Sequence, residues 1–112
     1  MNHITKLQEN LLTAVQTSPY HEKTIVFGEG AEAPLLMMIG EAPGGDEEKQ
    51  GRPFVGKAGK NLSAFLEVVG LKREEIYISN VVKLRPTKES PKTGKVVNRP
   101  PSAEEIAFFL PF

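Results

Sequence analysis

The stretch Leu35-Leu-Met-Met-Ile-Gly-Glu-Ala-Pro-Gly44 decides the fold, because five apolar residues run directly into a glycine-bounded turn. A continuous apolar run of this length is typical of a strand that is buried on both faces, as in a parallel sheet. Residues 60–69 follow with apolar side chains at helical spacing and end at Gly70, and residues 76–82 form a second β-branched run. The order strand, helix, strand predicts a βαβ unit with parallel strands.

The flanking segments extend this unit into an α/β chain. Apolar spacing predicts an amphipathic helix at 4–16, and residues 24–27 predict a short strand or extended segment. Six glycines between residues 40 and 59 predict a loop, as do the prolines and lysines of residues 84–101. Ser102-Ala-Glu-Glu105 is a capping box that opens a last helix. Together these elements predict the first half of an α/β domain, the alternative being a small complete domain with an exposed apolar end.

Composition restricts the class of protein. The 112 residues suffice for one domain, taken as residues 1–112, and 39% hydrophobic with 25% charged residues is typical of a globular chain. Lys+Arg and Asp+Glu number 14 each, so only a local patch can attract nucleic acid. No apolar run approaches the roughly 18 residues of a membrane span, and the N-terminus lacks a signal-peptide pattern, so we expect a cytoplasmic location and no membrane partner. The absence of cysteine excludes disulfides and cysteine-ligated metal centres, and no metal site is predicted.

Two polar residues follow the predicted strands. Glu41 lies in the glycine-bounded turn after the first strand, and Asn80 lies near the end of the second. Ligands bind beyond the carboxyl ends of the strands in open α/β sheets, which makes Gly40, Glu41, Ala42 and Asn80 candidate site residues. The alternatives are an exposed glutamate in an ordinary Pro-Gly turn and an asparagine that bonds to nearby backbone.

The glycine-rich segment 51–61 carries an unusual apolar pair, Phe54 and Val55. An aromatic ring in such a loop can stack on a planar ligand such as a nucleobase, or it can pack the loop against the core. Lys57 and Lys60 add positive charge at the start of the following helix, where backbone N–H groups favour an anion.

A basic segment follows the second strand. Six of the 14 positive charges lie between residues 83 and 99, against one acidic residue. Its members Lys83, Arg85, Lys92 and Lys95 are candidate phosphate contacts, together with Lys57 and Lys60. The alternative is a solvated, lysine-rich loop without a partner.

These motifs resemble those of a known family. Gly40-Glu-Ala-Pro-Gly-Gly-Asp-Glu-Glu-Lys-Gln-Gly-Arg-Pro-Phe-Val-Gly-Lys-Ala-Gly-Lys-Asn-Leu62 closely resembles the first motif region of the family 4 uracil-DNA glycosylases. Ile76-Tyr-Ile-Ser-Asn-Val-Val-Lys-Leu-Arg-Pro86 resembles the next motif, and Asn98-Arg-Pro-Pro-Ser-Ala-Glu-Glu-Ile106 resembles the lead into the following helix. The resemblance implies a three-layer α/β/α sandwich of the uracil-DNA glycosylase type, of which the N-terminal half with its βαβ unit is present.

The resemblance also assigns roles to the candidate residues. Glu41 matches the acid that positions or activates the attacking water, Phe54 the aromatic residue that stacks on a flipped uracil, and Asn80 the amide that reads its edge. Glu47 matches an acid of the first motif without an assigned role. The implied activity is hydrolysis of the N-glycosidic bond of deoxyuridine in DNA, a step of base excision repair, with uracil-containing DNA as the partner.

The sequence departs from the family in two respects. Members usually hold a four-cysteine iron–sulfur cluster, but the matching positions here are Val15, Ser18, Leu84 and Phe109, so we expect no cluster and no other cofactor. The family also continues for about another half domain, with a His-Pro-type motif that contacts uracil. We therefore expect the chain to be inactive alone and to associate with itself through its last helix and open sheet edge. The alternative is a truncated or degenerate glycosylase-like module that binds nucleic acid or a partner without catalysis.

Overall fold

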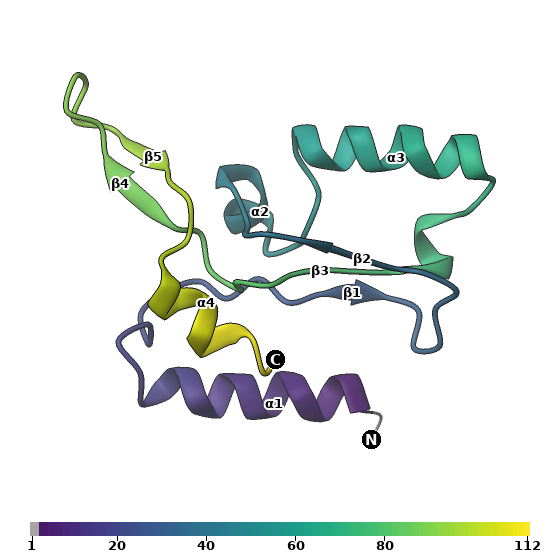
Figure 1. Cartoon of the computed structure of the whole chain (residues 1–112), viewed down its shortest axis with the longest axis horizontal. Helices are drawn as coiled ribbons and strands as arrows, with labels where there is room; N and C mark the ends of the chain where they lie inside the picture. Colours follow the sequence, from purple (N-terminus) through teal and green to yellow (C-terminus); the bar gives the residue numbers. More distant parts are fainter. Residues whose placement is uncertain (1–2) are drawn as a thin grey trace.

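A three-stranded sheet runs through the middle of the chain (Figure 1). The structure, a computed structural model, describes residues 3–112, with side chains from residue 4 onward. Strands β2 (Met37–Gly40) and β3 (Tyr77–Asn80) are parallel, and their register runs from Met37 opposite Tyr77 to Gly40 opposite Asn80. Strand β1 (Glu29–Gly30) pairs with the other side of β3 in the antiparallel direction. The predicted parallel βαβ unit is confirmed, with α3 (Lys57–Val69) as its helix.

Helices cover the two faces of the sheet in separate layers (Figure 1). On one face, Leu62 and Leu66 of α3 form a buried cluster with Ile78 of β3 and with Ile76, which directly precedes that strand. On the other face lie α1 (His3–Gln16) and α4 (Ala103–Phe109). They form a second buried cluster, which consists of Leu11, Val15, Val82, Leu84 and Phe109. The arrangement is the α/β/α layering that the sequence predicts.

The helix ends follow the predicted signals. Gly70 ends α3 in the left-handed conformation, with φ of 74°, which glycine adopts without steric cost. Ser102 caps α4 by accepting a hydrogen bond from the Glu105 N–H (3.1 Å), and the Glu105 carboxylate accepts one from the Ser102 N–H (2.8 Å). The predicted capping box is therefore confirmed. A short 3-10 turn, η1 (Arg73–Glu75), connects α3 to β3.

Strand β2 is buried on one face only, which corrects the sequence-based expectation. Leu36 and Met38 pack toward α3, whereas Met37 and Ile39 are 54% and 61% exposed. The strand lies at the edge of the sheet, and a groove rather than a packed helix lies beside these two side chains. An unbroken apolar run does not distinguish this arrangement from burial on both faces, because it lacks the polar alternation that marks a solvent-facing side.

Two predicted loops contain regular structure. The segment 40–59 holds the short helix α2 (Gly45–Gln50), and the segment 84–101 holds a hairpin of β4 (Thr87–Glu89) and β5 (Val96–Asn98). Residues 24–27 are extended but lie outside the strands, held in part by a bond from the Val26 N–H to the Lys83 carbonyl (2.7 Å). These pieces are too short to produce a clear periodic pattern in the sequence.

Among the described residues, no helix is both long and apolar enough to cross a bilayer.

Candidate active site

The parallel register brings the ends of β2 and β3 to one edge of the sheet. Beyond the paired residues, bonds from the Val81 N–H to the Gly40 carbonyl (2.9 Å) and from the Val82 N–H to the Glu41 carbonyl (3.0 Å) continue the pairing. A cavity of about 160 Å³ opens beside this edge. Its lining consists of Gly40, Glu41, Ala42, Glu47, Phe54, Ala58 and Asn80. The predicted catalytic acid and the four residues predicted to bind the base therefore surround one cavity.

Phe54 and Asn80 lie against the side of Gly40 from which a side chain would project. A Cβ atom built on Gly40 would overlap Asn80 Oδ1 and lie 2.8 Å from Phe54 Cζ. Only glycine leaves room for both groups at this position. The two predicted uracil-binding residues Phe54 and Asn80 therefore lie close together, while stacking of the ring on a base stays a prediction.

Asn80 and Glu41 differ in exposure. Asn80 is 4% exposed, and its main-chain oxygen accepts hydrogen bonds from Ser79 Oγ and Lys83 Nζ, whereas its side-chain amide bonds to none of the described residues. The amide thus keeps a donor and an acceptor for a ligand in the cavity. Glu41 is exposed at the mouth of the same cavity, where its carboxylate is accessible to water.

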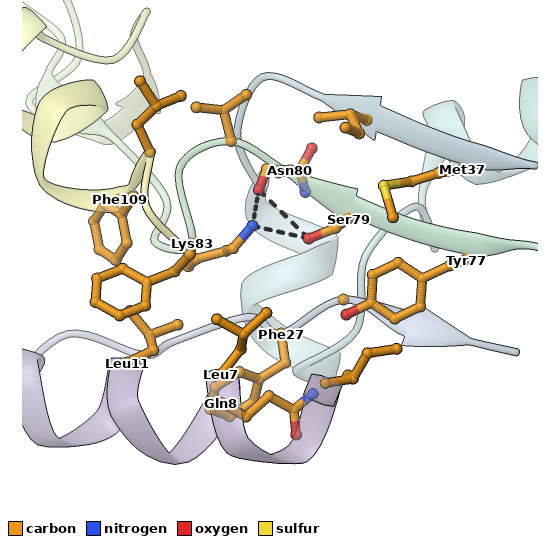
Figure 2. A pocket seen from close by; sticks show the side chains of 16 residues that line it. Leu7, Gln8, Leu11, Phe27, Met37, Tyr77, Ser79, Asn80, Lys83 and Phe109 are labelled. Atoms are coloured by element: carbon orange, nitrogen blue, oxygen red, sulfur yellow. Dashed lines mark hydrogen bonds between the residues drawn. The ribbon is translucent and has the colours of Figure 1, made fainter. Parts of the chain in front are cut away.

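Lys83 lies buried next to Asn80 rather than on the surface (Figure 2). Its ammonium donates hydrogen bonds to Ser79 Oγ (2.9 Å) and to the main-chain oxygen of Asn80. Burial lowers the pKa of this ammonium below its usual value, because the charged form loses hydration. This position does not suit the predicted phosphate contact, and Lys83 instead supports the strand end that carries Asn80.

The other basic residues predicted to contact DNA divide into two groups. Lys57 and Lys60 are exposed on the first turn of α3, and Lys92 and Lys95 are exposed near the tip of the hairpin. Arg85 is engaged within the chain, since its Nε donates to Asn98 Oδ1 (2.7 Å) and its Nη1 lies 3.7 Å from Glu48 Oε1. The four lysines are therefore the accessible members of the predicted set.

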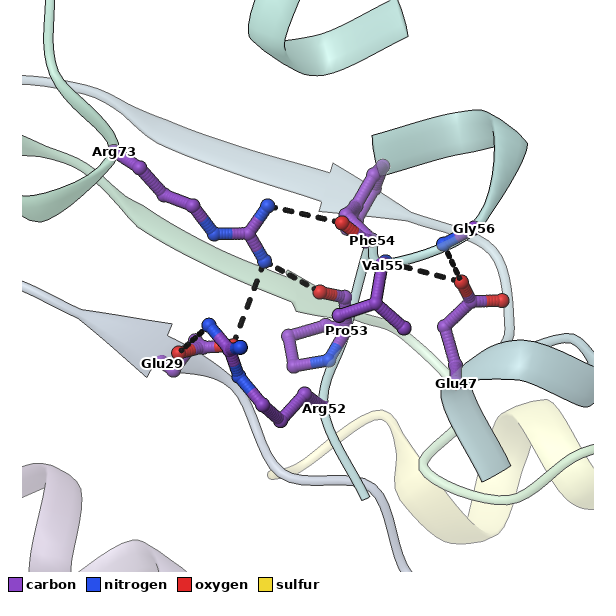
Figure 3. Close-up of polar contacts among 8 residues, drawn as sticks. All are labelled: Glu29, Glu47, Arg52, Pro53, Phe54, Val55, Gly56 and Arg73. Carbon is purple, nitrogen blue, oxygen red and sulfur yellow. Dashed lines mark hydrogen bonds and ion pairs between the residues drawn. The ribbon is translucent and has the colours of Figure 1, made fainter. Parts of the chain in front are cut away.

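Glu47 binds three backbone N–H groups around the cavity. Its carboxylate accepts hydrogen bonds from Gly44 (2.9 Å), Val55 (3.1 Å) and Gly56 (2.8 Å), the last two drawn in Figure 3. Burial alone would raise the pKa of Glu47, but the bonds from Gly56, Gly44 and Val55 outweigh it and hold the pKa below its usual value. The ionised carboxylate ties α2 to the residues that follow Phe54, a structural role that the sequence left unassigned.

Arg73 contacts the Phe54 segment, and the sequence did not predict this contact. From η1, its Nη1 donates to the Phe54 carbonyl (2.9 Å) and its Nη2 to the Pro53 carbonyl (2.6 Å), as Figure 3 shows. The partners are 19 and 20 positions apart in sequence and meet only through the fold. No local pattern around Arg73 distinguishes it from the other charged residues of its turn.

Comparison with known proteins agrees with the motifs and the fold. Residues 27–112 match the family model of the uracil DNA glycosylase superfamily. Over its whole length the chain is 38% identical to the Type-4 uracil-DNA glycosylase of Sulfurisphaera tokodaii, and over 97% of its length it is 40% identical to that of Pyrobaculum aerophilum. This chain belongs to the uracil-DNA glycosylase superfamily. It spans about half the length of these relatives, 48% and 52% respectively.

The positions that match the cluster cysteines of family 4 glycosylases hold residues of another kind. Val15, Leu84 and Phe109 lie in the buried cluster between α1 and α4. Ser18 Oγ donates to the Val15 carbonyl (2.7 Å) and accepts from the Tyr20 N–H (3.1 Å). The described residues contain no group of three or more His, Cys, Asp or Glu side chains arranged to hold a metal ion. The residues present do not fit an iron–sulfur cluster, since this superfamily member offers no thiolate there and fills the space with packed apolar side chains.

Proposed function

We propose that this chain supplies the base-binding residues of a DNA repair glycosylase that hydrolyses the N-glycosidic bond of deoxyuridine in DNA. The observation that carries the proposal is the single cavity at the sheet edge, around which Glu41, Phe54 and Asn80 converge. Membership of the uracil-DNA glycosylase superfamily supports the proposal, as does the identity to enzymes named Type-4 uracil-DNA glycosylases.

Recognition of the base uses the two residues nearest Gly40. An enzyme that acts on a base in DNA first rotates it out of the stack, and the extruded uracil places its ring against Phe54. The Asn80 amide then donates to the O4 carbonyl of uracil and accepts from its N3–H, a pairing that matches the donor and acceptor pattern of that edge. Burial of Asn80 makes the pairing selective, because a base with the reverse pattern leaves buried polar groups unpaired.

Glu41 is the residue that assists cleavage of the N-glycosidic bond. The C1′–N1 bond breaks with its electron pair leaving on uracil, and positive charge develops on the sugar. The Glu41 carboxylate stabilises that charge and orients a water molecule, whose oxygen forms the new bond to C1′ while one of its protons passes to the carboxylate and uracil leaves as its anion. The exposed position of Glu41 at the cavity mouth suits contact with the sugar rather than with the base.

Contact with the DNA backbone is proposed for Lys57, Lys60, Lys92 and Lys95. These lysines are exposed, and two of them lie on the first turn of the helix that follows the Phe54 loop. Binding through phosphate contacts releases counterions and therefore depends strongly on salt.

Association with a second copy of the chain is also proposed. Strand β2 is an edge strand, and the apolar side chains Met37, Ile39, Leu7 and Leu110 beside it are exposed. An open edge and an apolar surface together favour pairing with another chain.

The proposal is tested with short single-stranded DNA that contains one 2′-fluorodeoxyuridine, whose N-glycosidic bond resists hydrolysis. We expect the chain to bind this strand more tightly than a matched strand with 2′-fluorodeoxycytidine in its place, because cytosine presents the reverse donor and acceptor pattern to Asn80. Phe54→Ala and Asn80→Ala should each reduce the preference for uracil by about tenfold, since stacking and a buried hydrogen bond are each worth roughly 1–3 kcal/mol. Val68→Ala, which removes an exposed apolar side chain on α3, is the control.

Two further outcomes decide between the candidate functions. Equal binding of the uracil and cytosine strands would contradict base recognition by this cavity. A preference for uracil by this chain, without release of uracil from ordinary deoxyuridine DNA by a full-length protein that contains it, would support the alternative, a glycosylase-like module that binds without catalysis. Release of uracil that falls in Glu41→Gln would support the enzyme.

A further inference from the structure

Phe54 has an unusual backbone conformation for an aromatic residue. Its φ is +53°, and among the described residues it is the single non-glycine residue with positive φ. A bulky side chain rarely adopts this left-handed region, because Cβ then crowds the neighbouring carbonyl. Such conformations persist only where the surrounding structure holds them, and they are found most often at functional sites.

The carbonyl groups on one side of Phe54 are held by a single guanidinium. Arg73 donates to the Phe54 carbonyl through Nη1 and to the Pro53 carbonyl through Nη2, at 2.9 and 2.6 Å. The Phe54 carbonyl also rests against Gly59 of α3, where a Cβ atom would overlap it. The position and direction of this peptide are therefore fixed from two sides.

The N–H groups on the other side of Phe54 are held by Glu47. Its carboxylate accepts from Val55 and Gly56, the two residues that follow the ring (Figure 3). The Arg73 guanidinium thus binds the carbonyls of Pro53 and Phe54, and the Glu47 carboxylate binds the N–H groups of the two residues that follow. Each charge is matched to the partial charge of the backbone groups that it contacts.

The guanidinium is itself oriented by a carboxylate. Glu29 Oε1 of β1 lies 3.5 Å from Arg73 Nη2, and the same carboxylate pairs with Arg52 (2.9 Å). Arg73 does not line the 160 Å³ cavity, and its hydrogen bonds run to oxygens of Pro53, Phe54 and Glu29 rather than to the cavity residues Glu41 and Asn80. Any influence of Arg73 on a ligand in that cavity must therefore pass through Phe54.

We propose that Arg73 is a positioning residue for the base-stacking ring: its fork holds the Pro53 and Phe54 carbonyls, fixes the left-handed backbone of Phe54, and thereby directs the ring toward Gly40 and Asn80. This inference rests on the proposed function for its consequence in DNA binding, but not for its structural part. Lysine cannot replace the fork, because a single ammonium lacks the planar set of donors that reaches two successive carbonyls and a carboxylate.

The structural part is tested by NMR on the 112-residue chain. The ring of Phe54 shifts the resonances of Gly40 and of the Asn80 side-chain amide, and Phe54→Leu defines their positions without the ring. We expect Arg73→Lys to move these resonances toward the Phe54→Leu values. Lys72→Ala, which removes a positive charge from the adjacent exposed residue, should leave them unchanged. Unchanged Gly40 and Asn80 resonances in folded Arg73→Lys would overturn the proposal.

The consequence for binding is tested by a double-mutant cycle. We expect Arg73→Lys to reduce the preference for the 2′-fluorodeoxyuridine strand by about fivefold, part of the roughly tenfold or larger contribution of base stacking. In the Phe54→Ala background the same substitution should have no further effect, because its influence passes through the ring. An equal loss in both backgrounds would overturn the proposal in favour of a general structural role.

The two measurements separate this inference from the proposed function. If the wild-type chain shows no preference for uracil, the proposed function fails, and the NMR comparison still decides whether Arg73 holds the ring. Should Arg73→Lys fail to fold, Glu29→Gln provides the second variant, since it leaves both carbonyl bonds in place and removes only the carboxylate that orients the fork. It should then produce a smaller shift of the same resonances, and no shift at all would count against the inference.

Discussion

Single charged side chains, buried or half-buried, hold the backbone around the cavity. Glu47 binds three N–H groups, Arg73 binds two carbonyls, and Lys83 binds the main-chain oxygen of Asn80. Each of these side chains bonds to main-chain atoms of a predicted site residue or of its chain neighbours. The positions of Phe54 and Asn80 therefore depend on residues whose own chemistry with DNA is indirect.

Replacement of Glu47 by glutamine should destabilise the fold. The amide keeps one acceptor oxygen for the three N–H groups and directs its own NH₂ at the others, so buried donors lose their partner. We expect the free energy of unfolding to fall by about 2 kcal/mol at pH 7, measured by urea denaturation. Glu48→Gln, a substitution at the more exposed neighbour in α2, is the control and should change it far less.

The same pair of variants gives a pH dependence with a definite sign. The pKa of Glu47 is lowered in the folded chain, so its contribution to stability is present above the ordinary glutamate pKa and is lost as the pH falls through the lowered value. Between pH 7 and pH 3 the wild-type chain should therefore lose more free energy of unfolding than Glu47→Gln. Identical pH profiles for the two proteins would contradict the assignment of an ionised, bonded Glu47.

Residues of the site were predictable to different degrees. The motif and the strand ends placed Glu41, Phe54 and Asn80 around one site, because the carboxyl ends of parallel strands meet at one edge. Lys83 was assigned to the surface from its charge, but the chain turns after β3 and directs it inward. Arg73 carried no signal, since its partners lie far away in sequence.

The hairpin of β4 and β5 carries three exposed lysines, Lys88, Lys92 and Lys95. It extends away from the sheet (Figure 1), and its turn is closed by bonds between Ser90 and Lys95 (2.8 Å) and between Gly94 and Ser90 (2.8 Å). Arg99 fixes its base, donating from Nε to the Thr87 carbonyl (2.9 Å). The segment is thus a hydrogen-bonded β-hairpin that carries Lys92 and Lys95 near its tip, rather than an irregular loop.

Charge reversal at the hairpin should weaken DNA binding in a salt-dependent way. Each phosphate contact contributes roughly 0.7 to the slope of log K against log salt for single-stranded DNA, so the double variant Lys92→Glu/Lys95→Glu should reduce that slope by about 1.4. The measurement is fluorescence anisotropy across a salt series. Lys6→Glu/Lys72→Glu carries the same change in net charge at exposed positions outside the motifs and serves as control. Equal slopes for the two double variants would contradict phosphate contact by the hairpin.

Elements with a long periodic pattern were predicted, and short ones were not. Helix α3 has apolar residues at helical spacing and a glycine stop, and β3 has a β-branched run, so both appear where the sequence places them. Helix α2 has six residues and depends on bonds from Glu47 to the backbone, and the strands of the hairpin have three residues each. These short elements are stabilised by tertiary contacts and by a turn, and neither produces a periodic pattern of apolar residues in the sequence.

At the scale of the whole molecule, two separate cores hold the layers together. The core between α1 and α4 includes Val15, Leu84 and Phe109, positions that match iron ligands in family 4 glycosylases. Around it, the rings of Tyr20, Phe108 and Phe109 pack at centroid distances of 4.9 to 5.7 Å, two of the three pairs edge to face. Aromatic packing of this kind adds to the burial of apolar area, so these rings stabilise the contact of α4 with α1 and the turn that follows it.

The face of the sheet that α1 and α4 cover is packed less completely beside β2. A groove of about 250 Å³ separates α1 from β2, and Figure 2 shows Leu7, Leu11 and Met37 around it. Exposed apolar side chains along an unpaired strand edge favour association, because pairing satisfies backbone groups and removes apolar area from water in one step. We therefore expect the 112-residue chain to sediment as a dimer or larger species at micromolar concentration.

Substitutions in the groove test whether this surface is responsible. Ile39→Lys places a charge on the exposed face of the edge strand and should shift the chain toward the monomer, because the ammonium would lose its hydration in a paired interface. Val68→Lys introduces the same charge at an 85% exposed apolar residue of α3, on the opposite face of the sheet, and should leave the sedimentation coefficient unchanged. A wild-type chain that stays monomeric at all concentrations would contradict the prediction. Dissociation by both lysine variants alike would mean that net charge, rather than the edge of β2, controls association.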